Sequence, residues 1–414
     1  MRTGGAKQDA ERPSLVFAAC QSPYPPDNGA RIRTHHLLTG LARAFETVFV
    51  TFDHSHAGDG PHSGKEQLEQ LYPDVEVITV PGSRIGKRAA QAMTLFRRES
   101  WTHGRYRSRE LAEAVRGAVA ARGARIVHFD DLGVALVGPV AEALCVYSSH
   151  NVEEQILRHG ARAGSLPRRM FYALEARKVG AEERSVLGSM DLSLAVSPDD
   201  AEAMKAGGAA RVEVCPNGSP PVERLPFRPR ADGEPLRLLF VGTASYVPYE
   251  RGLAWFVREA LPLIERHTPV VFEVVGDPPA RPVRTPSVRY LGRVPSVEPF
   301  YAANHGVVVP VFEGSGTRLK ILEAMAYGRP VISTALGAEG LPVRAQEHFL
   351  QADDAEGFAA AADRLAQWSS DPAAEEAERL ISRARQAAAG LFWPDVARRL
   401  VELYRSELRR REWG

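Results

Sequence analysis

The chain has 414 residues, a formal net charge of +1, 44% hydrophobic residues and 25% charged residues. These proportions are those of a globular protein, which excludes a disordered, collagen-like or coiled-coil chain. The near-zero charge argues against a nucleic-acid partner, because proteins that neutralise phosphate backbones carry a basic surplus. The length favours two domains at roughly 100–200 residues each.

Cysteine spacing and hydropathy exclude further classes. The three cysteines are far apart, so neither a disulfide scaffold nor a cysteine zinc site is expected. No apolar run approaches the ~20 residues that span a bilayer, and the polar start lacks the apolar stretch of a signal peptide. We therefore expect a cytoplasmic protein with a flexible N-terminus at residues 1–13.

The first half of the chain alternates short β-branched runs with stretches of helical periodicity, which is typical of βαβ units around a parallel sheet. A strand is predicted at 14–19, then a proline- and glycine-rich turn at 22–29 and a helix at 30–44. Further strands are predicted at 47–52, 75–80, 125–129, 144–148, 192–196 and 212–215, and further helices at 108–121 and 168–187.

A proline-rich linker at 219–235 interrupts this alternation, which then restarts. Strands are predicted at 236–241, 270–275, 288–291, 306–311 and 330–333, and a helix at 251–266. The sequence therefore predicts an α/β fold with two Rossmann-like domains, each built on a parallel sheet. Their expected bounds are 14–218 and 236–391.

The last segment, 392–414, has the pattern of an amphipathic helix with an arginine-rich outer face. Its apolar stripe consists of Val396, Leu400, Leu403, Tyr404 and Leu408. Such a helix has to dock on a surface. Two surfaces remain open from the sequence: the first domain, or the second domain that directly precedes it.

A glycine turn between an apolar strand and a helix is the strongest functional signal. Gly314 and Gly316 allow the backbone to approach a ligand closely, and Thr317 is the predicted N-cap of a helix at 317–327. The free N–H groups and partial positive charge at a helix start favour an anion. The turn therefore predicts an anion-binding site.

Charged side chains in this helix extend the prediction from an anion to a nucleotide. Arg318 and Lys320 fall at the helix start, where cations are unfavourable unless an anion joins them. Glu323 lies on the same face, ~4.5 Å along the axis, where a carboxylate can accept hydrogen bonds from ribose hydroxyls. The alternative is a plain Lys320–Glu323 ion pair worth ~0.2–0.5 kcal/mol. A P-loop and a complete GxGxxG motif are both missing.

The run from Gly314 to Leu341 resembles the donor-binding signature of glycosyltransferase family 4, within the GT-B fold. It reads Gly-x-Gly-Thr-Arg-x-Lys-x-Leu-Glu-Ala-Met-Ala-x-Gly-x-Pro-Val, and weaker similarity covers most of the chain. The resemblance implies two domains that face each other across a cleft. The C-terminal domain would hold a nucleotide-diphosphate sugar, and the N-terminal domain the acceptor. It further implies transfer with retention of anomeric configuration, without a metal or another cofactor.

The resemblance also assigns roles to single residues. The expected donor-binding residues are Gly29, Gly242, Thr243, Gly314, Ser315, Gly316, Thr317, Arg318, Lys320 and Glu323. Arg318 and Lys320 would hold the diphosphate, and Gly29 would let the first loop approach it. Ser315 stands where many members have a glutamate that contacts the transferred sugar, so the identity of that sugar stays open.

His150 is the third expected catalytic residue, with Arg318 and Lys320. It follows a predicted strand at the carboxyl edge of the first sheet, where ligands of open α/β sheets collect. The family often has a histidine here, close to the sugar; a structural histidine is the alternative. For Asp130-Asp131 a loop cap is expected, and a place on the acceptor side is the alternative. The remaining histidines lack the spacing of metal ligands, so no metal site is predicted.

The segment 84–109 is strongly basic with interleaved apolar residues. It fits a surface for anionic lipid or an anionic acceptor, and equally a solvated helix face.

Together these features predict a metal-independent, retaining glycosyltransferase. Its donor would be a nucleotide-diphosphate sugar and its acceptor a small molecule, a glycan or a lipid-linked molecule, with peripheral membrane contact as an option. A sugar-nucleotide epimerase of the same fold and a non-catalytic, two-lobed nucleotide-sugar binding protein remain as alternatives.

Overall fold

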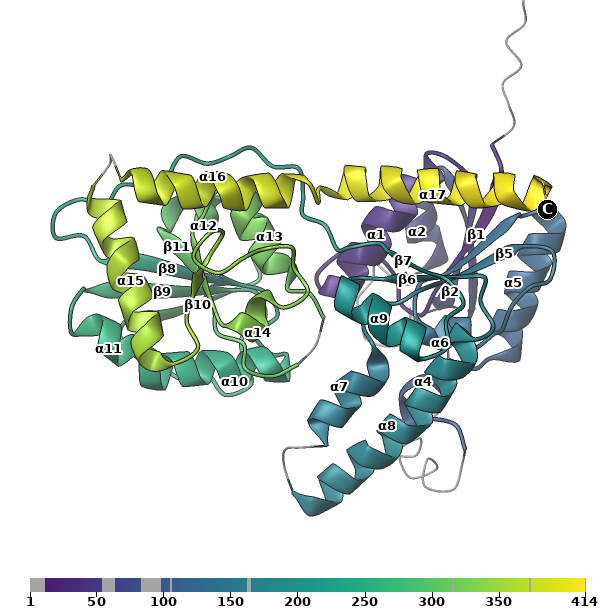
Figure 1. Ribbon diagram of the computed structural model, residues 1–414, viewed down its shortest axis with the longest axis horizontal. Coiled ribbons are helices and arrows are strands. Elements are labelled where there is room, and N and C mark those ends of the chain that lie inside the picture. The colour runs from purple at the N-terminus through teal and green to yellow at the C-terminus, as the bar shows by residue number, and fades with distance from the viewer. Residues whose placement is uncertain are drawn as a thin grey trace, which may run out of the picture.

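The chain folds into two α/β domains that lie side by side, each built on a sheet whose paired strands are all parallel (Figure 1). The predicted fold class is therefore confirmed. The computed structural model describes residues 12–53, 64–82, 98–104, 106–161, 165–314, 316–371 and 374–413. Most of the expected flexible start and most of the basic segment 84–109 lie outside the described residues.

The first sheet has the strand order β3-β2-β1-β4-β5-β6-β7. Its strands are β1 (Ser14–Ala19), β2 (Glu46–Asp53), β3 (Val75–Pro81), β4 (Ile126–Phe129), β5 (Leu144–Ser148), β6 (Leu192–Ala195) and β7 (Val212–Val214). Its helices are α1 (Gly29–Ala42), α2 (Lys65–Leu71), α4 (Trp101–Gly104), α5 (Arg109–Arg122), α6 (Leu132–Ala135), α7 (Glu153–Gly160), α8 (Leu166–Leu187) and α9 (Pro198–Ala206).

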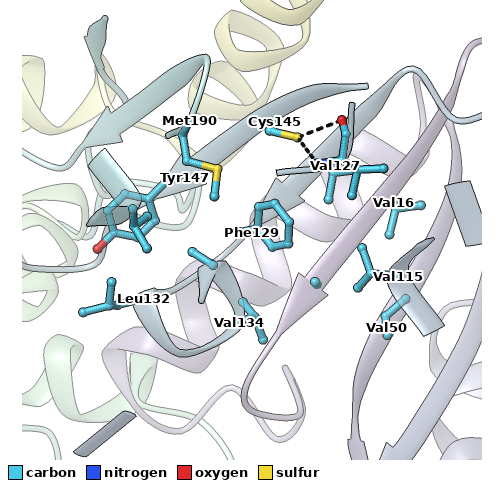
Figure 2. Close-up of a cluster of buried hydrophobic side chains, with 14 of the residues drawn as sticks. Val16, Val50, Val115, Val127, Phe129, Leu132, Val134, Cys145, Tyr147 and Met190 are labelled. Carbon is cyan, nitrogen blue, oxygen red and sulfur yellow. Dashed lines mark hydrogen bonds between the residues drawn. The ribbon is translucent and has the colours of Figure 1, made fainter. Parts of the chain in front are cut away.

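Helices cover both faces of this sheet, so its strands are apolar on both sides. Along β1, Val16 and Ala18 belong to one buried cluster, and Leu15 and Phe17 belong to the other. Figure 2 shows the first cluster, in which side chains from β1, β2, β4 and β5 gather and Val115 of α5 lies near Val16 and Val50. The alternation along β1 is the two-residue period that a sheet covered on both faces requires.

The second sheet has the order β10-β9-β8-β11-β12-β13. Its strands are β8 (Leu236–Val241), β9 (Val270–Val275), β10 (Val288–Gly292), β11 (Gly306–Val309), β12 (Val331–Ser333) and β13 (Leu350–Gln351). Its helices are α10 (Val247–Trp255), the π-helical η1 (Phe256–Ala260), α11 (Leu261–Glu265), α12 (Glu298–Ala303), α13 (Leu319–Ala326), α14 (Ala335–Ala338), α15 (Ala355–Ser370) and α16 (Glu375–Ala389).

The chain crosses between the domains twice. Ser219 and Phe392 form an isolated parallel bridge where the two crossing segments meet. After this crossing the last helix, α17 (Trp393–Trp413), runs back along the first domain (Figure 1). Its apolar stripe, including Leu400 and Tyr404, joins the cluster that contains Leu37 and Leu41 of α1. The C-terminal helix therefore docks on the first domain.

Candidate functional site

A cavity of about 660 Å³ lies between the two domains. Residues of α7, α8 and α9 line it on one side, and residues of α10 and of the turn after β11 line it on the other. Among the predicted site residues, Gly314, Gly316 and Thr317 line this cavity. Ligands of open parallel sheets gather at such an edge, where the carboxyl ends of the strands meet.

The turn after β11 contains two glycines in the left-handed region of backbone space. Gly314 and Gly316 have φ values of 102° and 84°, which glycine adopts at little cost. A Cβ on Gly316 would overlap the side-chain oxygen of Asn151, in the first domain. Gly316 therefore allows the turn to pack directly against the loop that carries His150. Ser315, between the two glycines, lies outside the described residues.

The helix after this turn begins later than the sequence suggested. Arg318 occupies the N-cap position of α13 and makes no capping hydrogen bond through its side chain. The prediction that Thr317 caps the helix is wrong, because Oγ1 of Thr317 instead accepts a hydrogen bond of 2.7 Å from Nδ2 of Asn217. The first N–H groups of α13 are thus left without a side-chain cap, and they can donate hydrogen bonds to a bound anion.

Two cations meet at the start of α13 without a carboxylate partner. Arg318 and Lys320 are only 4% and 8% exposed, and neither forms an ion pair with a described residue. The Arg318 guanidinium folds back onto the carbonyl of Gly316, and Nζ of Lys320 has no hydrogen-bond partner among the described residues. Because an unpaired buried cation is costly, this arrangement favours an anionic ligand.

Aromatic rings hold the Lys320 side chain. Its Nζ lies 3.8 Å from the ring centroid of Phe240 and 3.4 Å from that of Tyr249. Gly242 leaves the necessary space, because a Cβ there would lie 2.8 Å from Nζ. Burial, and then the Arg318 cation, lower the pKa of Lys320 well below its ordinary value. The ring faces attract the ammonium but offer it no hydrogen-bond acceptor.

Glu323 lies one turn further along α13. Its Oε2 accepts a hydrogen bond of 3.0 Å from the hydroxyl of Tyr301, whose ring stacks on Tyr327. Burial raises the pKa of Glu323 despite that hydrogen bond. The simple alternative, a Lys320–Glu323 ion pair, is not formed by these two described side chains, because each has turned to an aromatic partner.

The first domain contributes the start of α1. Gly29 is the first residue of α1, and Asn28 caps the helix by accepting a hydrogen bond from the Arg31 N–H. A Cβ on Gly29 would lie 3.7 Å from the Leu319 side chain, so the starts of α1 and α13 face each other. Two helix N-termini therefore converge across the cleft, and both favour negative charge.

The residue before this cap ties the loop to the second domain. The Thr243 hydroxyl donates a hydrogen bond of 3.5 Å to the backbone oxygen of Asp27. The Asp27 carboxylate forms an ion pair of 2.8 Å with Arg293. Thr243, expected at the donor, thus also contacts the facing domain.

His150 lies two residues beyond the end of β5. Its Nε2 lies 3.3 Å from Oδ2 of Asp130, and the His150 side chain is 14% exposed. Burial acts to lower the pKa of His150, but the Asp130 carboxylate beside it raises that pKa above its ordinary value. The next residue, Asn151, contacts the Gly316 turn, so the histidine loop and the cationic turn meet across the cleft.

Sequence reasoning missed Asp130. A loop cap was expected for Asp130-Asp131, and only Asp131 fulfils that role, by accepting a hydrogen bond of 3.0 Å from the Val134 N–H at the start of α6. Asp130 is instead fully buried between His128 and His150. The alternation of β4 could have shown that His128 and Asp130 point to the same side, but His150 is remote in sequence.

Two further expectations concern metals and membranes. Among the described residues, no group of three or more His, Cys, Asp or Glu side chains is arranged to hold a metal ion. Within the same part of the chain, no helix is long and apolar enough to cross a membrane.

Comparisons with known proteins agree on the fold. Residues 235–367 match the family model described as Glycosyl transferases group 1. Sucrose-phosphate synthase from Thermosynechococcus elongatus is similar with a TM-score of 0.66 at 18% identity, over 95% of this chain and 99% of that one. Anabaena HepE in complex with UDP is similar with a TM-score of 0.63 at 15% identity, over 95% of this chain and 100% of that one. WaaG, a glycosyltransferase involved in lipopolysaccharide biosynthesis, is similar with a TM-score of 0.62 at 16% identity, over 94% of this chain and 99% of that one.

No curated protein sequence matches this chain. The second domain thus matches the glycosyl transferases group 1 model over residues 235–367, and the whole chain has the GT-B fold, as the sequence predicted.

Proposed function

We propose that this protein is a retaining, family 4-like glycosyltransferase that moves a hexosyl or related sugar from a nucleotide-diphosphate donor to an acceptor hydroxyl without a metal. One observation carries the proposal. Arg318 and Lys320 are buried, have no carboxylate partner among the described residues, and lie at an uncapped helix start beside the cleft. A diphosphate supplies the negative charge that this arrangement lacks. HepE, similar in fold, is described with UDP and with UDP-glucose, which supports this donor class.

The proposed mechanism is electrostatic. The bond between the sugar's anomeric carbon and the diphosphate oxygen breaks, and the acceptor oxygen forms a bond to that carbon on the same face. The proton of the acceptor hydroxyl passes to the departing phosphate oxygen, so no protein nucleophile takes part. Arg318, Lys320 and the N-terminus of α13 stabilise the charge that grows on the diphosphate, a preorganised effect of several kcal/mol.

The other predicted residues position the donor. Glu323 would accept hydrogen bonds from the ribose hydroxyls through the oxygen that Tyr301 leaves free. Gly29 would bring the N–H groups of α1 to the phosphates from the opposite wall. Contacts between the domains, such as Asp27–Arg293, would exclude water, so that transfer outcompetes hydrolysis.

The acceptor would enter through the interdomain cavity. Three exposed apolar side chains of the second domain, Tyr246, Val247 and Phe312, line it, and Tyr172 of α8 lines the opposite side. A lining of this kind suits an amphipathic acceptor. Among the acceptor classes that the sequence left open, it favours a lipid-linked one.

The start of α8 would contact lipid. Leu166 and Met170 are four residues apart, hence on one helix face, and are 68% and 65% exposed. The exposed Arg169 accompanies them and would attract an anionic surface. The same helix lines the cavity, so this contact would place a lipid-borne acceptor near the cleft.

A two-stage experiment tests the proposal. A panel of nucleoside diphosphates is first screened by thermal unfolding, because a ligand at 100 times its dissociation constant adds ~2.7 kcal/mol of stability. The matching nucleotide sugars are then incubated with and without acceptors, and the products are identified by mass spectrometry. We expect stabilisation by one nucleoside diphosphate and transfer only when an acceptor is present.

Each alternative gives a different product pattern. Nucleotide release with a modified sugar and no need for an acceptor would identify an epimerase. Tight binding with no turnover against any acceptor would identify a binding protein. If no nucleoside diphosphate stabilises the protein, the proposal is wrong.

A further inference from the structure

A buried chain of polar side chains runs from the C-terminal helix to His150. The Tyr404 hydroxyl, in α17, lies 2.5 Å from Nδ1 of His128. Nε2 of His128 lies 3.2 Å from Oδ1 of Asp130, and Nε2 of His150 lies 3.3 Å from Oδ2 of the same carboxylate. Tyr404, His128 and Asp130 are fully buried. This series of side-chain contacts therefore connects the last helix to His150 through the interior of the first domain.

The proton positions in this chain follow from the chemistry of its members. Burial lowers the pKa of His128 despite Asp130, so its ring is neutral and carries one N–H. A carboxylate can only accept, so that N–H is on Nε2 and donates to Asp130. Nδ1 of His128 then accepts from the Tyr404 O–H. The Thr34 hydroxyl also lies 2.5 Å from Oδ2 of Asp130. The side chains of Thr34 and His128 thus both donate hydrogen bonds to Asp130.

Asp130 requires a cation, and His150 is the available one. A buried carboxylate is costly unless it is paired and hydrogen-bonded. No lysine or arginine of the described residues is within ion-pair distance of Asp130, and His128 is neutral. Burial acts to raise the pKa of Asp130, but His150 and His128 together hold it below its usual range. Asp130 and His150 therefore form a carboxylate–imidazolium pair.

Other charges around His150 do not replace this pair. Arg33 of α1 opposes the proton on His150, and Asp131 favours it more weakly than Asp130 does. His128 of β4 is neutral, and Glu153 of α7 is itself influenced by the His150 charge. Burial raises the pKa of Glu153 to about 7, with Glu183 adding to that rise, so this carboxyl is only partly ionised near neutral pH.

The position of His150 directs its charge toward the cleft. Nε2 of His150 is buried against Asp130, so the exposed part of the ring lies on the side remote from that carboxylate. The adjacent Asn151 touches the Gly316 turn, which leads directly into Arg318. His150 is thus one residue away from a contact with the turn that leads into Arg318.

We propose that Asp130 is a positioning residue, which fixes the His150 ring from behind and keeps it cationic toward the cleft, while His128 and Tyr404 hold Asp130 in place. In the transfer reaction, the His150 cation would face the departing diphosphate from the wall opposite Arg318 and Lys320. This role rests on the proposed function. The coupling between Asp130 and His150 does not, and it can be measured without substrate.

The first test measures the His150 pKa directly. Full-length protein with ¹⁵N-labelled histidine is titrated by NMR, and the His150 signal is assigned by its loss in His150→Gln. Asp130→Asn keeps the size of the side chain but removes its charge, so we expect the His150 pKa to fall by at least one unit. An unchanged pKa in the folded variant would overturn the inference.

The second test measures activity against pH. If the imidazolium is the active form, kcat/KM declines as pH rises through the His150 pKa. Asp130→Asn should move that alkaline limb to lower pH, with a loss of at least tenfold at pH 8 and a smaller loss at pH 6. A uniform loss at all pH values would indicate a merely structural role and would contradict the inference.

Two further variants complete the design. If Asp130→Asn does not fold, Tyr404→Phe is used instead, because it removes only the hydroxyl that supports His128. We then expect a smaller decrease of the His150 pKa. An unchanged His150 pKa in Tyr404→Phe would contradict the proposed role of Tyr404 and His128. The control is Asp191→Asn, because Asp191 also binds α17, through Arg411, but is not the carboxylate that lies against His150. A lowered His150 pKa in a protein that transfers no sugar would support the coupling and refute the proposed function.

Discussion

At the scale of single residues, Lys320 shows how this site differs from a surface ion pair. Sequence position alone marked it as a cation at the unfavourable end of a helix. The structure adds that its ammonium is buried on the rings of Phe240 and Tyr249 and forms no hydrogen bond within the part of the chain that the structure describes. The nearest carboxylate on the same face, Glu323, is bonded to Tyr301 instead. The cation therefore contributes little to folding and is available to a ligand.

Replacing Lys320 by methionine should separate stability from function. Lys320→Met keeps an unbranched apolar stem and removes the buried charge, so the unfolding temperature should stay the same or rise. Loss of the charge from the proposed diphosphate site should lower kcat/KM by roughly 100-fold, or about 2.7 kcal/mol. Thermal unfolding and transfer kinetics measure the two effects.

The matched control is Lys205→Met. Lys205 is a lysine of α9 that forms an ion pair with Glu202 at the surface, and its replacement should leave both stability and kinetics nearly unchanged. Wild-type turnover in Lys320→Met would contradict the diphosphate site.

At the scale of elements, α1 and α17 pack closely through a glycine. Gly40 lies within α1, where glycine normally lowers helix stability relative to alanine. A Cβ on Gly40 would overlap the Cβ of Ala397 in α17. The glycine therefore serves the approach of two helices whose residues are more than 350 positions apart in the chain.

Gly40→Ala should destabilise the first domain by roughly 1–3 kcal/mol, because the added methyl forces the two helices apart. Gly117→Ala is the control, since Gly117 lies in α5 and a Cβ there meets nothing within 4 Å. That change should instead stabilise by about 0.5–1 kcal/mol. Urea unfolding of both variants gives the comparison. Equal effects of the two substitutions would show that α17 does not press on α1.

The local sequence pattern predicts which helices and strands are present better than it predicts the residues at which they begin and end. Four strands, including β5 and β8, have the predicted bounds, because a buried parallel strand is a continuous apolar run between turn residues. The helix expected at 251–266 is less regular: it starts at Val247 as α10, continues through η1 and ends as α11. Pro262 lacks an N–H, so the regular hydrogen-bond ladder cannot continue through it. β13 was not predicted, because its two residues are too few to show the apolar run of a strand.

At the scale of the whole molecule, the site could be predicted only where one segment contains it. The cationic turn at Arg318 and Lys320 is contiguous, and sequence reasoning located it. The hydrogen bond from Asn217 to Thr317 joins residues 100 apart, and the bond from Tyr404 to His128 joins residues 276 apart. Such pairs depend on how the domains and the last helix dock, which periodicity does not encode.

The whole molecule also has two unlike sides. α17 runs along one side, and the α7–α8 hairpin projects from the first domain on the other (Figure 1). The projecting start of α8 carries the exposed Leu166 and Met170. Arg168 and Tyr172, on the opposite face of the same helix turns, line the interdomain cavity. One element thus presents an apolar face outward and a polar, aromatic face to the proposed acceptor site.

We expect the protein to bind vesicles that contain anionic lipid through this start of α8. The double variant Leu166→Ser/Met170→Ser should weaken co-sedimentation by roughly tenfold or more, because each apolar side chain contributes about 1.5–3 kcal/mol when it leaves water. The double variant Leu71→Ser/Leu291→Ser removes two exposed leucines from other surfaces and should bind like the wild type. High salt should weaken binding, since Arg169 acts through charge. Equal binding by the two double variants, or none by the wild type, would contradict the lipid contact while leaving transfer to soluble acceptors unaffected.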